Sequence, residues 1–549
     1  MTFSFFDFGR PEEEVEDGSP RQGIDATLCV QNNVSLTLAG ESLVVAGWAA
    51  SKDHGFEQTP TRSCCDFILA PSTHYLLPSI LVHYVGERRQ LHTRRTTPVF
   101  HPLVPDQKTS LYFAEAQNPR RLSIPYFNIL WAEAIDGFLA INYAKPNSKT
   151  DVVLATLSYA IDQQHNSATE TWVETLLSIS YGEAQRKKRI KVLINPFGGK
   201  GNARRNFFKD VEPIFVAANC HIDAVMTEYQ GHAVDIAENI DIDAWDVMAA
   251  CSGDGVLCEI FNGLGKKENA SEALGKIAVA HIPCGSGNAM SWNLYGSGSP
   301  SMAALCTIKG LRTPLDLVSI TQGPRRTLSF LSQAFGIVAD SDLGTDNLRW
   351  MGAARFTYGF LVRLFGNTVY PCELAVKVEL DDKKLIKEHY SAIVRDKSAS
   401  EPCGEPPRHK GLPPLQYGVA TDPIPSDWEL ISHDKLGNFY AGNMAFMAQD
   451  ANFFPAALPN DGYLDLITIR GDVSRFVALQ MLKALDNGTL FDMPDVRVQK
   501  ISGYRITPKD RDEGYISIDG EKVPFEPFQA EVHQGLGTVI SKSGYKYEI

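Results

Sequence analysis

Apolar and polar positions alternate with a period of two over much of the first third of the chain. Residues 34–38 and 138–143 show this pattern most clearly, and turn residues separate one such run from the next. The alternation predicts short, half-buried strands, so we expect a small antiparallel β domain over residues 25–143. A helical pattern follows at residues 168–182, where one face collects four apolar side chains: Trp172, Val173, Leu176 and Leu177.

A small sheet closed by one helix resembles a pleckstrin-homology-type module, and we assign residues 25–186 to a β-rich module of this kind. Residues 1–24 are acidic and contain proline and glycine, which predicts a disordered N-terminus. The basic run at residues 186–189 ends the module. It is open to two interpretations, a solvated linker or a patch that faces phosphates or a membrane.

After residue 186 the pattern changes to alternating strands and helices. Apolar runs begin near Ile190, His221, Trp245 and Ile277, and amphipathic helical stretches separate them. Strands that alternate with helices predict a parallel sheet covered by helices on both faces. We assign residues 187–312 to this α/β domain.

Strand patterns return after Thr313, at residues 315–320, 327–334, 374–380 and 463–470. Residues 355–365 are apolar on most sides, and they either pack against a core or form a wall that contacts lipid. Residues 396–427 are rich in proline and lack apolar periodicity, which predicts a disordered surface insertion. We assign residues 313–549 to one C-terminal domain that contains this insertion.

Composition narrows the class of protein. A content of 44% hydrophobic and 21% charged residues in 549 is typical of a globular protein with two to four domains. The formal net charge of -13 argues against a broad nucleic-acid surface. We find no secretory signal, no apolar run of the ~18 residues that a transmembrane helix needs, and no zinc pattern among the cysteines. These features favour the cytoplasm.

Three glycine-rich turns follow apolar runs of the α/β domain at the spacing of one βα unit. They are LINPFGGKG (193–201), SGDG (252–255) and IPCGSGNA (282–289). Glycine lets a phosphate approach free backbone N–H groups, and a helix starts behind each turn. The first turn is not a Walker loop, because no Gly-Lys-Ser/Thr closes it. Together the turns predict a nucleotide cleft.

Asp254 lies in the second turn, at the end of a strand, where open α/β sheets bind ligands. Transfer of a γ-phosphoryl group requires Mg²⁺, groups that hold the phosphate charge, and a carboxylate that deprotonates the acceptor hydroxyl. We predict that Asp254 is this base. Arg349 and Arg355 are candidates to hold the phosphates, with two solvated helix arginines as the alternative.

Five motifs occur in order along the chain: INPFGGKG, SGDGVLCEIFNGL, IPCGSGNA, SQAFGIVADSDLGTDNLRWMGAARFTYG and IDGE. With these motifs, residues 190–541 resemble the sphingoid-base kinases, the sphingosine kinase family within the diacylglycerol-kinase-like superfamily. The resemblance implies a kinase that uses ATP and Mg²⁺ to phosphorylate the terminal hydroxyl of a long-chain base. It also implies an α/β nucleotide-binding domain, an antiparallel β-sandwich lipid-binding domain, and an active site between them.

The resemblance further implies roles for single positions, with Asp254 as the general base. The implied nucleotide contacts are Asn195, Pro196, Phe197, Gly198, Gly199, Lys200, Thr227, Ser252, Gly253, Gly255, Glu259, Gly285, Ser286, Gly287, Arg349, Arg355, Asp519, Gly520 and Glu521. The implied lipid contacts are Ser332, Asp340, Asp342, Phe360 and Asp465. A sphingoid base carries an ammonium, and a site that desolvates an ammonium must supply a carboxylate. The sequence assigns no metal ligand.

Several positions depart from the animal members of that family. Phe197 replaces a small basic or polar residue, residues 344–346 replace a glutamate-rich segment, and Asp465 replaces a histidine near the lipid. The long N-terminal module and the proline-rich insertion instead resemble fungal or plant long-chain-base kinases. These enzymes suggest dihydrosphingosine or phytosphingosine as the base, and sphingosine stays open as well.

Other functions remain to be weighed. A ceramide or diacylglycerol kinase would have the same superfamily fold, and a nicotinamide-nucleotide kinase shares the Asn-Pro and Gly-Asp-Gly turns but lacks the IDGE motif. A different class is a membrane-binding adaptor with an inactive kinase fold. Such an adaptor has no need of Asp254, Arg349 and Arg355 together, so their presence favours an enzyme.

A lipid substrate requires contact with a membrane. We expect a cytoplasmic protein that associates peripherally with the endoplasmic reticulum, Golgi, endosome or plasma membrane. The net charge of -13 excludes bulk electrostatic attraction to anionic lipid as the cause. Three features remain as candidates: an apolar lid at residues 356–365, the N-terminal module, and lipidation of Cys64 and Cys65, which are alternatively buried structural thiols.

Overall fold

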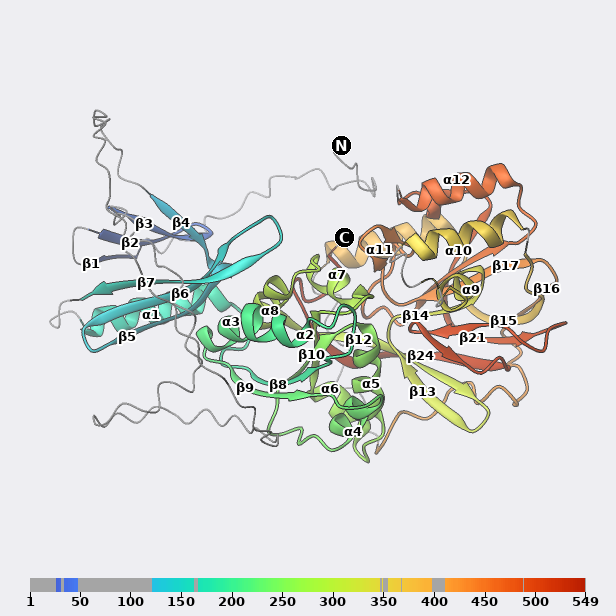
Figure 1. The fold of residues 1–549 in the computed structure, drawn as a ribbon, viewed down its shortest axis with the longest axis horizontal. Coiled ribbons are helices and arrows are strands. Elements are labelled where there is room, and N and C mark those ends of the chain that lie inside the picture. The colour runs from blue at the N-terminus through green and yellow to red at the C-terminus, as the bar shows by residue number, and fades with distance from the viewer. Residues whose placement is uncertain are drawn as a thin grey trace, which may run out of the picture.

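The structure is a computed structural model that describes residues 26–30, 34–47, 121–161, 166–345, 348, 354–366, 368–396, 410–486 and 488–548. The predicted disordered N-terminus, the Cys64–Cys65 pair, Arg349 and residues 397–409 lie outside the described residues. Three units follow one another along the chain: a β-rich module, an α/β domain and a second β-rich domain (Figure 1).

The N-terminal module contains two antiparallel sheets and a helix. Its elements are β1 (Thr27–Val30), β2 (Val34–Ala39), β3 (Ser42–Ala46), β4 (Leu122–Pro125), β5 (Ile129–Ile135), β6 (Phe138–Pro146), β7 (Val152–Ala160) and α1 (Asn166–Tyr181). Strands β1 to β4 form one sheet and β5 to β7 the other. The four apolar side chains predicted on one helical face are all buried, and the Trp172 indole N–H donates to the carbonyl of Ala26 at 3.1 Å. The predicted β-rich module with a closing helix is confirmed.

The α/β domain is built on a parallel sheet with the strand order β9-β8-β10-β11. Its elements are β8 (Arg189–Ile194), α2 (Ala203–Asn206), α3 (Glu212–Ala217), β9 (His221–Met226), α4 (His232–Glu238), β10 (Val247–Ser252), α5 (Asp254–Gly265), α6 (Ala270–Lys276), β11 (Ala278–Pro283), α7 (Ala289–Tyr295) and α8 (Pro300–Lys309). Helices α2, α3, α7 and α8 cover one face and α4, α5 and α6 the other (Figure 1). Every residue of β10 and β11 is buried, as central parallel strands require. The predicted parallel sheet is therefore confirmed.

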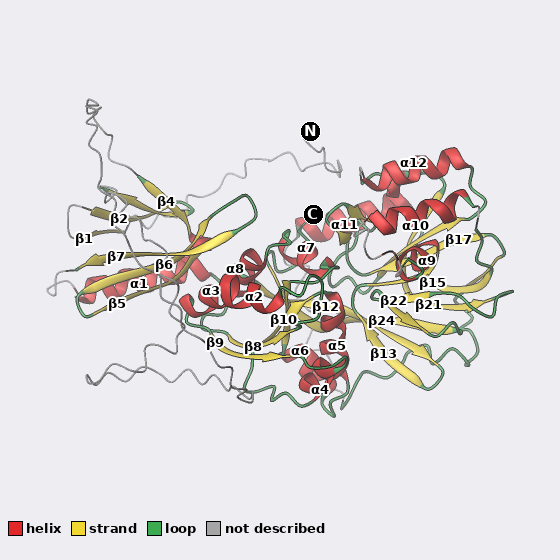
Figure 2. Cartoon of the chain, in the orientation of Figure 1, coloured by secondary structure: helices red, strands yellow, loops and turns green. Residues whose placement is uncertain are grey.

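The C-terminal domain is mainly antiparallel. Its elements are β12 (Leu311–Gln322), β13 (Arg325–Ser329), β14 (Ser332–Gly336), α9 (Ile337–Leu343), α10 (Ala354–Phe365), β15 (Cys372–Leu380), α11 (Lys383–Arg395), β16 (Glu429–His433), β17 (Leu436–Gly442), β18 (Phe446–Ala448), β19 (Ala451–Asn452), β20 (Leu464–Arg470), α12 (Arg475–Asp486), β21 (Val496–Pro508), β22 (Ile516–Ile518), β23 (Glu521–Val523) and β24 (Phe528–Ser541). Helices α9, α10 and α12 lie on one side of these strands (Figure 2). The sequence pattern predicted strands here and did not separate α11 and α12 from them.

Strand β24 joins the two larger domains. It pairs in parallel with β11 of the α/β domain and antiparallel with β12 and β21 of the C-terminal domain. The same sheet therefore runs through both domains, and a site between them rests on continuous hydrogen-bonded backbone.

The predicted insertion is only partly outside the described residues. Residues 410–427 form irregular backbone that packs between the two domains, so they do not match the expected disorder. The Gly411 carbonyl accepts from the Ser271 hydroxyl of α6, and the backbone N–H groups of Gln416 and Tyr417 donate to the carboxylate of Glu531. This docking could not be predicted from the proline-rich sequence, because backbone hydrogen bonds to distant residues leave no periodic pattern in it.

Two buried lysines, Lys188 and Lys309, lie where the N-terminal module meets the α/β domain. The Lys309 ammonium nitrogen donates to the carbonyl of Ile129 at 2.8 Å and lies 3.8 Å from the centre of the Tyr181 ring. Lys188 donates to the carbonyl of Ile308. Burial lowers the pKa of Lys309 to about 6 and that of Lys188 to about 8. Docking of the module thus contributes to the desolvation of Lys309, through Ile129 and Tyr181.

The buried amine of Lys309 predicts a specific pH dependence of stability. Above pH 6 the folded amine is neutral, whereas the unfolded amine stays protonated up to about pH 10. Unfolding therefore takes up a proton, and the folded state gains up to ~1.4 kcal/mol per pH unit as the pH rises. We expect the free energy of unfolding of the wild type, minus that of Lys309→Met, to rise in this way from pH 6.5 to 8.5. Chemical denaturation measures it, with the exposed Lys145→Met as control; a difference independent of pH would contradict the assignment.

Candidate active site

The predicted site residues gather at one edge of the parallel sheet. The first glycine loop follows β8, the second follows β10 and the third follows β11, while Thr227 follows β9. The order of the strands reverses between β8 and β10, which is the switch point where open α/β sheets bind ligands. The fold therefore brings the three loops together at the position where a nucleotide is expected.

The three glycine loops interlock backbone against backbone. A Cβ atom on Gly285 would lie 2.2 Å from the Cα of Gly253, and one on Gly253 would lie 2.9 Å from the carbonyl oxygen of Gly287. Gly199 has a φ of +56°, and a Cβ there would lie 2.8 Å from the carbonyl oxygen of Cys284. Since any larger residue would separate the loops, glycine is needed here for contact between loops as well as for turning.

Side chains inside the loops hold their shape. The Asn195 side-chain oxygen accepts from the backbone N–H of Phe197, and the Asn288 side chain makes two bonds with the backbone of Gly285. Lys200, Ser286 and Phe197 are exposed at the rim. The loops therefore present backbone N–H groups on a fixed frame, with two polar side chains and one aromatic ring at its rim.

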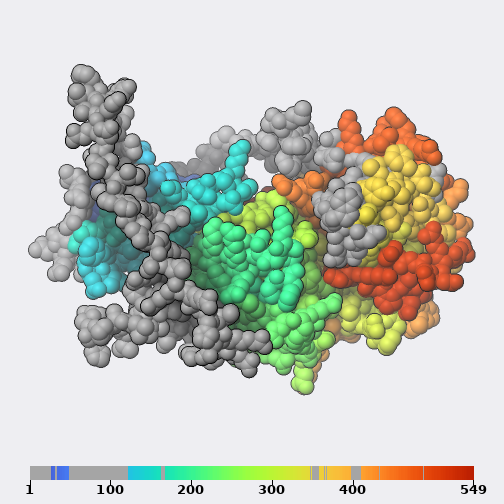
Figure 3. Space-filling view, in the orientation of Figure 1, coloured from blue at the N-terminus to red at the C-terminus, as the bar shows by residue number. Residues whose placement is uncertain are grey.

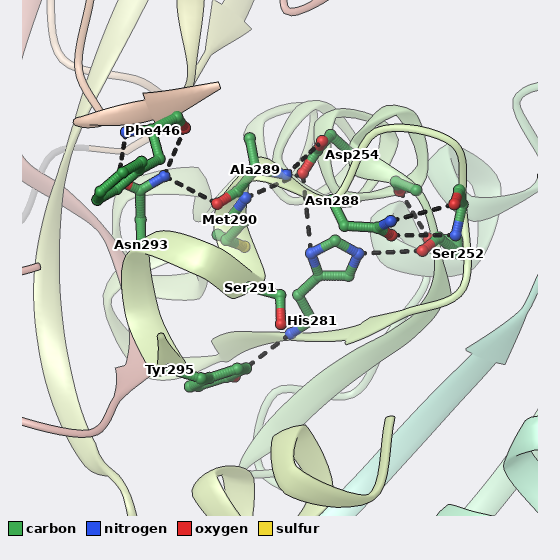
Figure 4. A network of polar contacts seen from close by, with 12 residues as sticks. Ser252, Asp254, His281, Asn288, Ala289, Met290, Ser291, Asn293, Tyr295 and Phe446 are labelled. Atoms are coloured by element: carbon green, nitrogen blue, oxygen red, sulfur yellow. Dashed lines mark hydrogen bonds and ion pairs between the residues drawn. The ribbon is translucent and has the colours of Figure 1, made fainter. Parts of the chain in front are cut away.

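Asp254 begins α5 and points across the second loop toward the third (Figure 4). One carboxylate oxygen accepts the backbone N–H of Ala289 at 2.8 Å, and the other accepts that of Met290 at 3.1 Å. The nearer of the His281 ring nitrogens, Nδ1, lies 3.7 Å from a carboxylate oxygen. The residue is buried, with 8% of its surface exposed. The carboxylate is thus fixed between the second and third loops.

A pocket of about 560 Å³ opens beside the loops. Six predicted nucleotide contacts line it: Asn195, Phe197, Thr227, Gly255, Glu259 and Glu521. Glu521 is the first residue of β23 in the C-terminal domain, and its carboxylate approaches Gly255 closely enough that a Cβ there would lie 3.3 Å from it. Both large domains therefore form the pocket wall.

Two predicted nucleotide contacts, Glu259 and Asp519, bind backbone groups of the protein itself. Glu259 accepts the backbone N–H groups of Gly231 and Ala233, so it fixes the start of α4 while it lines the pocket. Asp519 is fully enclosed and accepts four hydrogen bonds, from the Ser329 hydroxyl and from three backbone N–H groups at the start of β14. Asp519 therefore holds the strand that carries Ser332 and has no free oxygen directed at a nucleotide. The sequence could not distinguish these support roles from direct contact.

The predicted lipid contacts Ser332 and Asp342 both act on Tyr440. The Ser332 and Tyr440 hydroxyls are 3.5 Å apart, and burial, with a smaller effect from the charge of Asp342, raises the pKa of Tyr440. Tyr440 is a residue that the sequence analysis missed. Its strand, β17, lies next to β14, and pairing between distant strands cannot be inferred from a motif.

Asp340 does not join this group. Its carboxylate binds the Arg363 guanidinium at 3.1 Å and the Tyr370 hydroxyl at 2.7 Å. Asp340 and Asp342 are two residues apart on α9, which places them on different faces of the helix. The Asp340 carboxylate therefore joins α9 to α10, and this is not the lipid contact that was predicted for it.

Asp465 is likewise engaged elsewhere. It is buried and binds the Lys500 ammonium at 3.0 Å, while Asp461 binds the same ammonium at 2.8 Å. Burial raises the pKa of Asp465 to about 6. Phe360, the remaining predicted lipid contact, packs on the apolar core of the C-terminal domain. Asp465 thus has a buried ion-pair partner instead of a lipid-facing position.

Arg349 and the side chain of Arg355 lie outside the described part of the chain, so their predicted contacts with phosphate stay predictions. Within the described residues, no group of three or more His, Cys, Asp or Glu side chains is arranged to hold a metal ion. In the same part of the chain, no helix is long and apolar enough to cross a membrane. The pocket is also lined by residues for which the motifs implied no contact: Tyr229, Gln230, Val234, Asn262 and Lys522.

Family models match all three units. Residues 189–320 match the diacylglycerol kinase catalytic domain, and residues 424–541 match the YegS C-terminal NAD kinase beta sandwich-like domain. Residues 26–182 match a domain of unknown function, DUF7493. An α/β domain of this family with its β-sandwich partner defines a lipid kinase.

Curated relatives narrow the class. Sphingoid long chain base kinase 5 of Saccharomyces cerevisiae is 35% identical over 467 residues, which are 73% of this chain and 67% of the relative. Sphingoid long chain base kinase 4 of Schizosaccharomyces pombe is 34% identical over 436 residues, which are 76% of this chain and 88% of the relative. Sphingosine kinase 1 of Homo sapiens is 28% identical over 376 residues, which are 66% of this chain and 92% of the relative. The chain belongs to the sphingoid long chain base kinase family.

Proposed function

We propose that this protein transfers the γ-phosphoryl group of ATP to the terminal primary hydroxyl of a sphingoid long-chain base. The observation that carries the proposal is the carboxylate of Asp254, held by two backbone N–H groups between the second and third glycine loops. A fixed carboxylate beside a phosphate-binding frame is what deprotonation of an alcohol acceptor requires.

The nucleotide is proposed to occupy the pocket that Asn195, Thr227 and Glu521 line, with its phosphates toward the glycine loops. A pocket of about 560 Å³ fits a ligand of this size. ATP supplies the phosphoryl group. The loops bind the phosphate oxygens through backbone N–H groups, and the contacts of Gly253, Gly285 and Gly287 keep those groups in a fixed arrangement.

Mg²⁺ is proposed to arrive with the nucleotide. The described residues offer no ready cluster of metal-binding side chains. This fits Mg²⁺, which usually keeps several waters and binds substrate phosphates together with one or two carboxylates.

The acceptor is proposed to be an aminated lipid because of Asp342. Its negative charge acts on Tyr440, whose hydroxyl is 3.5 Å from the hydroxyl of Ser332, so the group combines one acid with two hydroxyls. A sphingoid base has one ammonium and at least one free hydroxyl next to the reacting alcohol. Diacylglycerol and ceramide carry no ammonium with which the acid could interact.

Asp342→Asn is expected to raise the KM for a sphingoid base about 10- to 100-fold, as the loss of one charge-assisted hydrogen bond would. The KM for ATP should stay within about twofold of the wild type. Asp340→Asn is the matched control, because it removes the same charge from the same helix while its carboxylate binds Arg363. Steady-state kinetics with dihydrosphingosine in mixed micelles measures both. An equal rise in the two variants would assign the amine to another partner.

The test of the proposed function is a competition between acceptors. Purified protein receives Mg²⁺, ATP labelled at the γ-phosphate, and equal amounts of phytosphingosine, dihydrosphingosine, sphingosine, ceramide and diacylglycerol. We expect label on one or more of the sphingoid bases and none on the two neutral lipids. Label on ceramide or diacylglycerol would favour another lipid kinase, and no label on any lipid would favour an inactive adaptor.

Contact with the membrane is proposed to occur through α10 and α12, which lie side by side near the surface (Figure 3). Tyr358 and Val362 of α10 are 50% and 51% exposed, and Phe476 and Leu479 of α12 are 69% and 51% exposed. Apolar side chains gathered on two neighbouring helices fit a lipid surface.

The N-terminal module, with its two sheets and closing helix, is proposed to be pleckstrin-homology-like.

The double variant Phe476→Ser, Leu479→Ser is expected to weaken binding to phosphatidylcholine vesicles by tenfold or more, because each apolar side chain contributes about 1.5–3 kcal/mol when buried. Vesicle flotation measures the bound fraction. Val216→Ser removes an exposed apolar residue from α3 of the α/β domain and should leave binding unchanged. Equal binding by the double variant and the wild type would move the membrane contact elsewhere.

A further inference from the structure

His281 lies directly behind the carboxylate of Asp254. It is on β11, completely buried, and no sequence motif assigned it a role. Its Nε2 is 3.0 Å from the carbonyl oxygen of Ser252, and its Nδ1 is 3.7 Å from the nearer carboxylate oxygen of Asp254. Figure 4 shows the ring between these two groups.

The surroundings determine which ring nitrogen carries the proton. A carbonyl oxygen only accepts hydrogen bonds, so Nε2 must donate to Ser252. The neutral ring then has its lone pair on Nδ1, which makes no hydrogen bond in the structure. Burial lowers the pKa of His281, which favours this neutral form. In the resting protein, a lone pair and a carboxylate oxygen therefore face each other with no hydrogen between them.

Few of the groups that contact His281 and Asp254 can accept a proton. The two backbone groups on the Asp254 carboxylate, from Ala289 and Met290, are N–H donors and cannot accept. Around His281, Asp254 is the charged group that acts on the ring, while the Ser252 carbonyl faces Nε2 and the neutral Tyr295 hydroxyl accepts from the His281 backbone N–H. Among these contacts, Nδ1 is the acceptor that faces Asp254.

We propose that His281 is a positioning residue that accepts, at Nδ1, the proton that Asp254 removes from the lipid hydroxyl. The proposal rests on the proposed function and adds a second step to it. The hydroxyl O–H bond breaks as its oxygen bonds to phosphorus, and ADP leaves with the electron pair of the broken P–O bond.

The proton is first bound by Asp254 and is then donated to Nδ1. If it transfers fully, the ring becomes an imidazolium and Asp254 is again a carboxylate, so the total charge of the pair is the same in either position. A small approach of the two side chains from 3.7 Å gives a hydrogen bond, and such bonds are often long before substrate binds.

Two substitutions separate the two ring nitrogens. His281→Gln places an amide N–H near the position of Nε2 and keeps a donor for Ser252, but offers nothing at Nδ1. His281→Asn places an amide oxygen near the position of Nδ1 and loses the bond to Ser252. His533→Gln is the matched control, because His533 is another enclosed histidine whose Nε2 binds a hydroxyl, that of Ser319, in the C-terminal domain.

We expect His281→Gln to lower kcat roughly 10- to 100-fold with little change in either KM, which is less than removal of the base itself costs. His281→Asn should recover part of the loss, because an amide oxygen accepts a hydrogen bond from protonated Asp254. His533→Gln should keep the wild-type kcat. Wild-type kcat in His281→Gln would overturn the proposal, and so would a lower kcat in both His281 variants that merely follows a lower melting temperature.

A second measurement needs no substrate. Spectra of protein labelled with ¹⁵N-histidine, with His281 assigned by its absence from the His281→Gln spectrum, report the protonated ring nitrogen. We expect a neutral ring protonated at Nε2 at pH 7.5, and an Nδ1–H ring or an imidazolium would overturn the proposal. If the wild type phosphorylates no sphingoid base, the proposed function fails. If it does and His281→Gln is fully active, this inference fails alone.

Discussion

Asp254→Asn should bind ATP as the wild type does and lose kcat by about 10²- to 10⁴-fold, the range expected when a general base is removed. The amide has nearly the same shape as the carboxylate, so the interlocked loops are retained. It has one acceptor oxygen, however, and the carboxylate receives two backbone N–H groups, from Ala289 and Met290. We therefore also expect a loss of about 1 kcal/mol of stability from one unmade hydrogen bond.

The measurement pairs single-turnover kinetics with ATP binding by calorimetry on the same preparation. A folded variant that binds ATP normally and transfers phosphate slowly supports a role in proton removal. A variant that turns over at the wild-type rate would show that Asp254 only caps α7. Loss of ATP binding would instead assign Asp254 to the nucleotide.

Gly285→Ala should abolish most activity by a different route. The added Cβ would lie 2.2 Å from the Cα of Gly253, and neither backbone can rotate away as a side chain could. The second and third loops must separate, which disturbs both the phosphate-binding N–H groups and the Asp254 carboxylate. We expect kcat/KM for ATP to fall by 100-fold or more, because misplacement by about 1 Å already costs that much.

Gly275→Ala provides the matched control for the loop substitution. Gly275 lies on α6 of the same domain, and a Cβ there meets no atom within 4 Å. Alanine at this position should leave kcat unchanged and raise stability by up to about 1 kcal/mol, because it is the better helix former. Similar kinetics for Gly285→Ala and the wild type would contradict the interlocking of the loops.

Local patterns in the sequence were enough to predict the α/β domain. Strands β8 to β11 begin within two residues of the expected positions Ile190, His221, Trp245 and Ile277. Strands β8, β10 and β11 are each followed by a glycine turn, so the chain itself marks where they end. The β-rich module was predictable for the same reason, since alternation of period two reflects one buried face.

The site was predictable where a motif supplies contacts to its own neighbours. Asn195 and the glycines lie in continuous segments, and the structure brings six of the predicted nucleotide contacts into one pocket. Glu259 and Asp519 are in motifs too, but their carboxylates bind backbone N–H groups of other segments. Side-chain type and spacing alone do not reveal which of these two uses applies.

The remaining differences between the predicted and the observed site arise from contacts between residues that are distant in the sequence or on separate elements. Asp340 and Asp342 look alike in the sequence, and the positions of Arg363 and Tyr370 distinguish Asp340. Asp465 pairs with Lys500, and His281 faces Asp254, across strands that are distant in the chain or on separate elements. Partners of this kind depend on sheet order and side-chain direction, which hydrophobic periodicity does not encode.

The most direct test of the account is a crystal structure with a non-hydrolysable ATP analogue and a sphingoid base bound together. We expect the terminal hydroxyl oxygen of the lipid within about 2.6–3.2 Å of the Asp254 carboxylate, on the side of the γ-phosphate. The account is contradicted if the hydroxyl approaches the γ-phosphate while Asp254 keeps only its bonds to Ala289 and Met290 and no water links it to the lipid.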